Sequence, residues 1–170
     1  MPILPSTVTR AAVVREARAW IGTPYHHGAL VKGPQGGVDC AMLMAGVYGN
    51  VGYLPPFDVG HYPPDWFLHR RAERYLNMVT DHAEEIPESA ALPGDLVLFM
   101  VGHLYAHGAI VDEPGWPNII HAHSDAGMVI PDIGGTGRMA NAKRRFFTIW
   151  PPEPIAEDGI TATDKPEPAA

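Results

Sequence analysis

With 170 residues, the chain has the length of one domain that can bury a full hydrophobic core. Its net charge of −7 at pH 7 argues against binding to nucleic-acid backbones, since no basic stripe is present to displace counterions. Apolar runs stay well below the roughly 18 residues that a membrane span needs, so no membrane partner is expected. The N-terminus lacks a basic start followed by an apolar block, and we therefore expect cytoplasmic synthesis without a signal peptide.

The first half of the chain predicts helices separated by loops. Apolar residues recur at helical spacing over 7–21, which predicts an amphipathic helix. Residues 22–38 are rich in glycine and proline and predict a loop. A second helix is expected over 40–48 with Asp39 as its N-cap, and a third over 65–79.

The second half predicts an antiparallel sheet, because short β-rich runs follow one another between turn residues. These runs are PGDLVLFMV, HGAIVD, NIIHAH, GMVIP and RRFFTIW. Helices followed by strands indicate the α+β class. Residues 151–170 contain five prolines and five acids against one lysine, which predicts a disordered tail behind a single folded domain over 1–150.

Cys40 is the only cysteine, so it has no disulfide partner within the chain. One interpretation is a small buried hydrophobe, since free cysteine is among the most buried residue types. The other is a nucleophile, because the first turn of a helix offers free N–H groups and a positive dipole that lower a thiol pKa. A nucleophilic cysteine also needs a base and a group that orients the base.

Two histidines in the strand half meet this need. His107 opens HGAIVD and His121 follows fourteen residues later in NIIHAH. If these runs are adjacent antiparallel strands, the imidazoles can meet, with His107 facing the sulfur and His121 holding its tautomer. An alternative groups both histidines with His123 and Asp125 as a zinc site, but it leaves Cys40 unexplained. We expect neither a metal nor an organic cofactor.

Four stretches, taken in order, resemble the NlpC family of papain-like cysteine peptidases that act on bacterial cell walls. They are GTPYHHGA (22–29), GGVDCAML (36–43), LPGDLVLF (92–99), and AHGAIV with IIHAH (106–111 and 119–123). The resemblance implies a papain-like, NlpC-type α+β fold whose N-terminal helices pack on the antiparallel β-sheet that carries the histidines.

The resemblance also implies roles for single residues. The family's nucleophile, base and third polar residue match Cys40, His107 and His121. Tyr25 matches a tyrosine that lines the site and contacts substrate or the oxyanion. Asp39 matches the acid before the nucleophile and is likewise expected to contact substrate.

The sequence departs from the family pattern directly after the nucleophile. The family usually reads Asp-Cys-Ser-Gly, whereas Ala41 and Met42 occupy the last two positions here. The family serine would bond the substrate peptide, so its absence bears on peptide specificity and leaves the nucleophile in place.

The implied reaction is hydrolysis of an amide bond in peptidoglycan stem peptides, with the D-glutamyl–diamino acid bond favoured. The insert YLPPFDVGHYPPDWFLHRRAERYL (53–76) resembles the branch found in bacteriophage tails, prophages and gene-transfer-agent particles. This predicts phage-like tail proteins as partners and delivery to the cell wall within such a tail. The alternatives are an inactive structural tail-tip subunit, or another thiol-dependent amidase or acyltransferase on the same scaffold.

Residues 50–65 are expected to form one wall of the substrate groove, because a long irregular stretch beside the nucleophile's helix is uncommon without a function. Tyr53 and Tyr62 would bind substrate there. The alternative is that these aromatic residues cover a hydrophobic patch of the core.

Overall fold

The computed structural model describes residues 3–55 and 71–151. Its helices are α1 (Arg10–Arg18), α2 (Cys40–Asn50) and α3 (Arg71–Thr80), with single 3-10 turns at Glu88–Ala90 and Gly137–Met139. Its strands are β1 (Leu30–Val31), β2 (Gly37–Val38), β3 (Glu84–Ile86), β4 (Leu96–Val101), β5 (Leu104–Val111), β6 (Asn118–His123), β7 (Met128–Ile133) and β8 (Arg144–Thr148). None of the described helices is long and apolar enough to cross a membrane.

The helices begin where their caps place them. The side chain of Thr9 accepts the N–H of Ala12, so α1 starts at Arg10, and it is shorter than the expected 7–21. Asp39 caps α2 as predicted, and this helix continues two residues beyond the expected end. The described part of α3 falls within the predicted 65–79 except for its last residue, while 65–70 lie outside the described residues.

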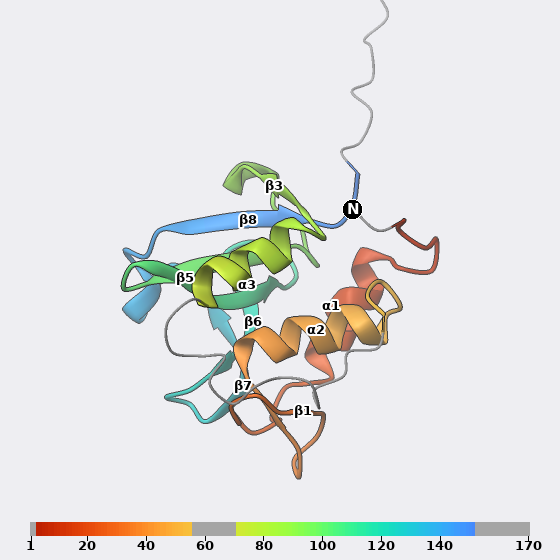
Figure 1. The fold of residues 1–170 in the computed structure, drawn as a ribbon. Helices are drawn as coiled ribbons and strands as arrows, with labels where there is room; N and C mark the ends of the chain where they lie inside the picture. Colours follow the sequence, from red (N-terminus) through yellow and green to blue (C-terminus); the bar gives the residue numbers. More distant parts are fainter. Residues whose placement is uncertain (1–2, 56–70, 152–170) are drawn as a thin grey trace, which may run out of the picture.

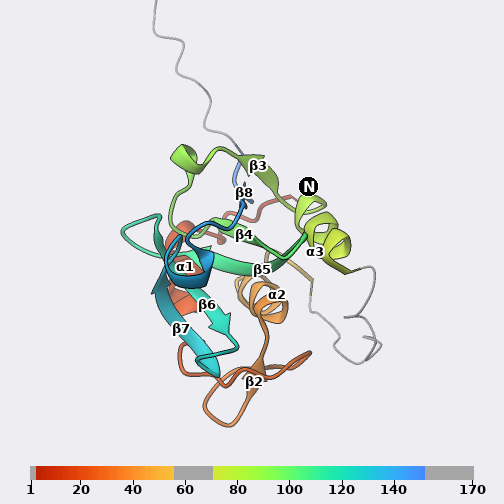
Figure 2. The ribbon, with the colours of Figure 1, turned by 90° about the vertical axis from the view of Figure 1, so that its left-hand side faces the viewer.

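Strands β3 to β8 form a six-stranded sheet in the order β3-β8-β4-β5-β6-β7, with every neighbouring pair antiparallel. The predicted antiparallel sheet is therefore confirmed, including the adjacency of β5 and β6. Strand β3 is an addition that the sequence patterns did not indicate. The short pair β1 and β2 lies within the stretch predicted as a loop, and Figure 2 shows this hairpin leading directly into α2.

All three helices contribute to one core against one face of the sheet. Figure 1 shows α2 and α3 lying along the sheet, where α2 contacts β5 and β6 and α3 contacts β5. The alternation of side chains along strands sends the intervening residues to the opposite face, into a second cluster. That cluster comprises Val97, Phe99, Ala109, Ile119 and Phe146. The nucleophile candidate therefore starts a helix that the core holds rigidly against the histidine-bearing strands.

Glycines 36 and 37 are required by close contacts in the β1–β2 hairpin. A Cβ at Gly36 would lie 1.9 Å from the carbonyl oxygen of Val31, and one at Gly37 would lie 2.6 Å from the Cβ of His26. These glycines let the hairpin close and so place the chain that enters α2. Residues 152–170, predicted to be a disordered tail, lie outside the described residues.

Candidate active site

Asp39 uses its carboxylate to organise the start of α2. One oxygen accepts the N–H groups of Ala41 and Met42 at 3.0 and 2.9 Å, which satisfies two free donors of the first turn. The other accepts the N–H of Gly28 at 2.7 Å and lies 3.3 Å from Nδ1 of His27. Asp39 thus ties the 22–29 loop to the helix. Being only 3% exposed, it has no free oxygen for substrate, which corrects its expected substrate contact.

The capping pattern leaves one backbone donor beside the thiol. The N–H groups of Ala41 and Met42 go to the Asp39 carboxylate, and the N–H of Leu43 goes to its carbonyl. Within the described residues, the N–H of Cys40 donates to no other residue. A free N–H at the positive end of a helix is the kind of donor that an oxyanion hole uses.

Cys40 is partly exposed, and its Sγ donates a hydrogen bond to the carbonyl oxygen of Ala106 on β5 at 3.6 Å. Loss of solvation and, to a smaller extent, the negative charge of Asp39 raise the pKa of the Cys40 thiol to about 12. Backbone N–H groups, that of Gly108 first among them, oppose this shift. The lowered pKa expected from the helix dipole is therefore wrong: desolvation outweighs it, and the resting form is the neutral thiol.

A β-bulge marks the place where the sulfur meets β5. Phe99 pairs with His107 and Met100 pairs with Tyr105, so Ala106 has no partner on β4. A bulge of this kind re-aims neighbouring side chains and recurs beside active sites. The sulfur contacts the carbonyl before His107 and the N–H after it, which places the thiol at the backbone of the candidate base.

His107 and His121 meet as the sequence predicts. Nε2 of His107 lies 2.8 Å from Nδ1 of His121, and the two rings stand edge to face with centroids 5.0 Å apart. The register pairs Ile110 with Ile120, so the two histidines are diagonal neighbours and are not directly opposite. Because Nε2 of His107 is engaged by His121, its Nδ1 is the nitrogen left for the thiol.

Both imidazoles are neutral in the resting site. Desolvation, with smaller contributions from the neighbouring His121 and His123, lowers the pKa of His107 to about 3. Desolvation also lowers the pKa of His121, which is 0% exposed, although Asp132 opposes that shift.

The Asp132 carboxylate lies 3.3 Å from Nε2 of His121, and the sequence analysis missed this residue. In the sequence, Asp132 is only one acidic residue in a β-rich run. The strand pattern does not distinguish it from other acidic residues.

Tyr25 lies in the same site, as the family resemblance implied. It pairs with Val38 just before the nucleophile, and its N–H donates to the carbonyl of Gly127 at 2.7 Å. Burial raises the pKa of Tyr25 to about 12, with smaller contributions from the charges of Cys40 and Asp39. Its hydroxyl therefore stays protonated and can donate a hydrogen bond.

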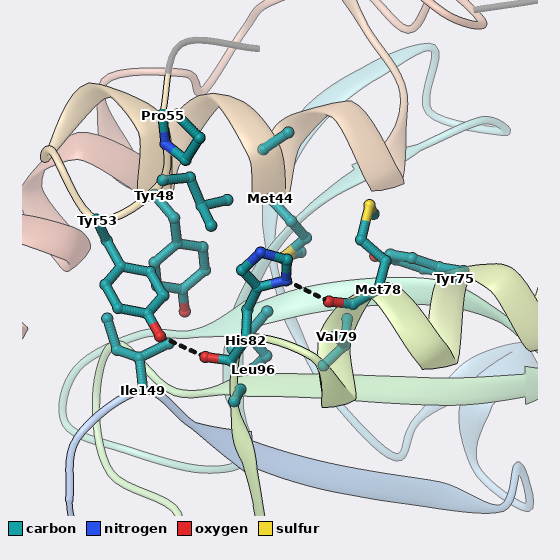
Figure 3. A pocket seen from close by; sticks show the side chains of 13 residues that line it. Met44, Tyr48, Tyr53, Pro55, Tyr75, Met78, Val79, His82, Leu96 and Ile149 are labelled. Carbon is teal, nitrogen blue, oxygen red and sulfur yellow. Dashed lines mark hydrogen bonds between the residues drawn. The ribbon is translucent and has the colours of Figure 1, made fainter. Parts of the chain in front are cut away.

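The structure does not support a substrate-binding role for Tyr53. It is only 5% exposed, its hydroxyl donates to the carbonyl of His82, and its ring packs against Tyr48. Tyr53 lines a cavity of about 280 Å³ that residues of α2 and α3 border (Figure 3). The lining of this cavity includes neither Cys40 nor either site histidine. Tyr53 is a core residue, as in the alternative considered for this stretch. Tyr62 lies outside the described residues.

The zinc alternative finds no support among the described residues, where no three histidine, cysteine or acidic side chains are arranged to hold a metal ion. Nδ1 of His123 accepts the N–H of Ala126 at 3.1 Å. Asp125 instead pairs with Arg138 at 2.9 Å.

The sequence matches a known protein family over most of its length. The model of the NlpC/P60 family matches residues 22–143, the span that carries every site residue described above. The chain belongs to the NlpC/P60 family. No curated protein matches it in sequence.

Solved structures of other proteins share the fold. The NlpC/p60 domain of the peptidoglycan hydrolase SagA aligns at a TM-score of 0.53 and 26% identity, covering 81% of this chain and 97% of that domain. The peptidoglycan hydrolase RipB from Mycobacterium tuberculosis aligns at 0.56 and 20%, covering 82% of this chain and 64% of RipB. The P60 domain of an antigen from Mycobacterium avium subspecies paratuberculosis aligns at a TM-score of 0.56 and 21% identity, covering 82% of this chain and 93% of that domain. The fold is therefore the papain-like NlpC-type α+β fold, and this NlpC/P60 chain is a peptidoglycan hydrolase-like domain.

Proposed function

We propose that this NlpC/P60 domain is a cysteine peptidase that hydrolyses an amide bond in peptidoglycan stem peptides. Cys40 is the nucleophile, His107 the base, and His121 the residue that orients the base. One observation carries the proposal: the Cys40 sulfur contacts β5 on both sides of His107, whose ring is fixed by the buried His121. The nucleophile thus lies against the backbone that carries the base, and the base contacts its orienting group, which is the set of groups that thiol acyl transfer requires.

Acylation begins from the neutral thiol and neutral imidazole. Nδ1 of His107 takes the thiol proton as the Sγ–carbon bond forms with the scissile carbonyl, so the thiolate exists only alongside the imidazolium. The carbonyl oxygen becomes negative and is held by the free N–H of Cys40 and the hydroxyl of Tyr25. This order of events fits the raised pKa of the Cys40 thiol. The proton leaves only as the Sγ–carbon bond forms, so no free thiolate has to be stabilised in the desolvated site.

The acyl-enzyme then forms and breaks down through the same imidazole. His107 gives its proton to the leaving amine as the carbon–nitrogen bond breaks. It next removes a proton from water, which attacks the thioester carbonyl, and it returns that proton to the sulfur as the acid product leaves. The reaction consumes one water and needs no external oxidant or reductant.

The bond that we propose is that between D-glutamate and the diamino acid, and the setting is a phage-like tail that reaches the cell wall. The described peptidoglycan hydrolases with this fold support the substrate class. The resemblance of the 53–76 insert to phage-tail and gene-transfer-agent proteins supports the setting and tail proteins as partners. Particles induced from the source strain should then contain the chain by mass spectrometry, and recovery only outside particles would count against the setting.

A digest of purified peptidoglycan tests the reaction. The wild-type chain should release fragments with a new D-glutamate carboxyl terminus, identified by mass, and the Cys40→Ala chain should release none. Cleavage of another amide bond would favour a different thiol amidase. Absence of any release by a folded wild-type chain would favour a structural tail-tip subunit.

A further inference from the structure

His121 is enclosed by three groups from three strands. Its Nδ1 faces Nε2 of His107 on β5, and its Nε2 lies 3.3 Å from Oδ2 of Asp132 on β7. The ring of His123, on the same strand, has its centroid 5.1 Å away. Within the described residues, the buried Nε2 of His121 makes no well-aligned hydrogen bond, so its contact with the Asp132 carboxylate is one of ion-pair distance. At 0% exposed, His121 has no bulk water to choose its tautomer.

We propose that Asp132 is a positioning residue that selects the tautomers of both histidines and so leaves Nδ1 of His107 free to accept the thiol proton. A carboxylate only accepts hydrogen bonds, so Nε2 of His121 must carry its hydrogen toward Asp132. Nδ1 of His121 is then an acceptor. Nε2 of His107 must therefore donate to it, which leaves the lone pair of His107 on Nδ1. This inference rests on the proposed peptidase function.

The opposite tautomers would block the reaction. If His121 carried its hydrogen on Nδ1, it would donate to Nε2 of His107, whose own hydrogen would then sit on Nδ1. That nitrogen could not accept the proton of Cys40. A negative group at the far end of the pair also favours the imidazolium that forms when Nδ1 of His107 takes this proton. No proton reaches Asp132 in this scheme.

The backbone around Asp132 makes one substitution unusually informative. Oδ1 of Asp132 accepts the N–H of Ile133 at 2.7 Å, while Oδ2 faces His121. In Asp132→Asn the amide oxygen keeps the bond to Ile133, and the NH₂ group then points at Nε2 of His121. An NH₂ donor there imposes the wrong tautomer, whereas Asp132→Ala merely removes the preference. Asp132→Asn, although nearly isosteric with the wild type, should therefore lose more activity than Asp132→Ala.

The test measures kcat and KM on a purified stem-peptide fragment. We expect kcat to fall about tenfold in Asp132→Ala and at least about 100-fold in Asp132→Asn, with KM unchanged in both. Asp125→Asn is the matched control: it removes an exposed carboxylate from the β6–β7 turn, and its kcat should stay at the wild-type value. A structural role for Asp132 predicts the reverse order, so Asp132→Asn as active as Asp132→Ala, or more so, overturns the proposal.

A second measurement does not depend on activity. Nitrogen-15 spectra of the histidine rings distinguish the two tautomers, and wild-type His121 should carry its hydrogen on Nε2 and shift to Nδ1 in Asp132→Asn. A wild-type His121 protonated on Nδ1 overturns the role of Asp132 even in an active enzyme. An inactive wild type with the expected tautomers would instead overturn the peptidase function alone.

Discussion

Cys40 and His107 meet through the backbone that flanks the histidine, because the Cys40 thiol donates to the carbonyl of Ala106 at the β5 bulge. A thiol that donates is protonated, and this agrees with the raised pKa that desolvation produces there. The reactive form of the sulfur is therefore produced by proton transfer to His107 during the reaction. Several consequences can be measured.

Alkylation by iodoacetamide should report the pKa of Cys40 directly, since it is the only cysteine in the chain. Because burial and Asp39 both raise the pKa of the thiol, the labelling rate should show its inflection above the ~8.5 of a free cysteine. Cys40→Ala provides the unlabelled control. An inflection well below that value would mean that the helix dipole and His107 outweigh desolvation.

Replacements at the two histidines should separate their roles. His107→Ala removes the base and should abolish turnover. His121→Asn can still hold Nε2 of His107 through its amide oxygen and should retain part of the activity, whereas His121→Ala should lose more. The measurement is the rate of stem-peptide turnover of each variant, compared at equal amounts of folded protein. Equal inactivity of His121→Asn and His107→Ala would show that His121 does more than orient.

Stability should fall on mild acidification because the pKa values of His107 and His121 are lowered by burial. Below about pH 6.5 the unfolded chain binds protons at these histidines while the folded chain does not, so unfolding becomes easier. The loss should begin near pH 6.5 and grow as the pH falls toward the folded-state pKa values of about 4 for His121 and about 3 for His107, and its part above about pH 5 precedes the titration of most carboxylates. Urea unfolding against pH measures it, and His107→Gln should flatten the curve. His103→Gln, which changes an exposed histidine, is the control. If the free energy of unfolding of both variants depends on pH in the same way, the loss of stability does not come from His107.

Gly108 and Tyr75 should be coupled in stability. A Cβ at Gly108 would lie 2.1 Å from the hydroxyl oxygen of Tyr75 and 3.2 Å from Leu98, so Gly108→Ala should cost about 1–3 kcal/mol. Tyr75 is 4% exposed and its hydroxyl has no partner among the described residues. Tyr75→Phe should thus be neutral or slightly stabilising. The double variant Gly108→Ala with Tyr75→Phe should recover part of the stability that Gly108→Ala loses. Thermal unfolding measures this, and strictly additive changes in the free energy of unfolding would contradict the contact.

Tyr53→Ala should destabilise the fold without changing the reaction. Its ring is buried against Tyr48 beside the α2–α3 cavity, so truncation should cost about 3–5 kcal/mol, as for other buried aromatic side chains. Tyr53→Phe should cost only about 1 kcal/mol for the lost bond to His82. Activity per folded molecule should match the wild type in both. A lowered kcat in a stable Tyr53→Phe chain would restore Tyr53 to the substrate site.

The local features of the site were predictable because they depend on neighbours in the sequence. Asp39 followed by an apolar run predicts a capped helix, and Cys40 then falls in its first turn whatever the rest of the chain does. Two β-rich runs joined by a proline-containing turn predict adjacent strands, which brings His107 close to His121. The order of four short motifs pointed to the family, and the family fixes the fold.

Three features depended on tertiary packing alone. The pKa of Cys40 reverses its expected direction because desolvation arises from atoms far away in sequence, which a helix dipole argument does not include. Tyr53 turned from an expected groove residue into a core residue because its ring packs against Tyr48 and its hydroxyl bonds the carbonyl of His82, far away in sequence. Asp132 reaches His121 only through the register of β6 against β7, and a shift of one residue would move its carboxylate to the other face of the sheet.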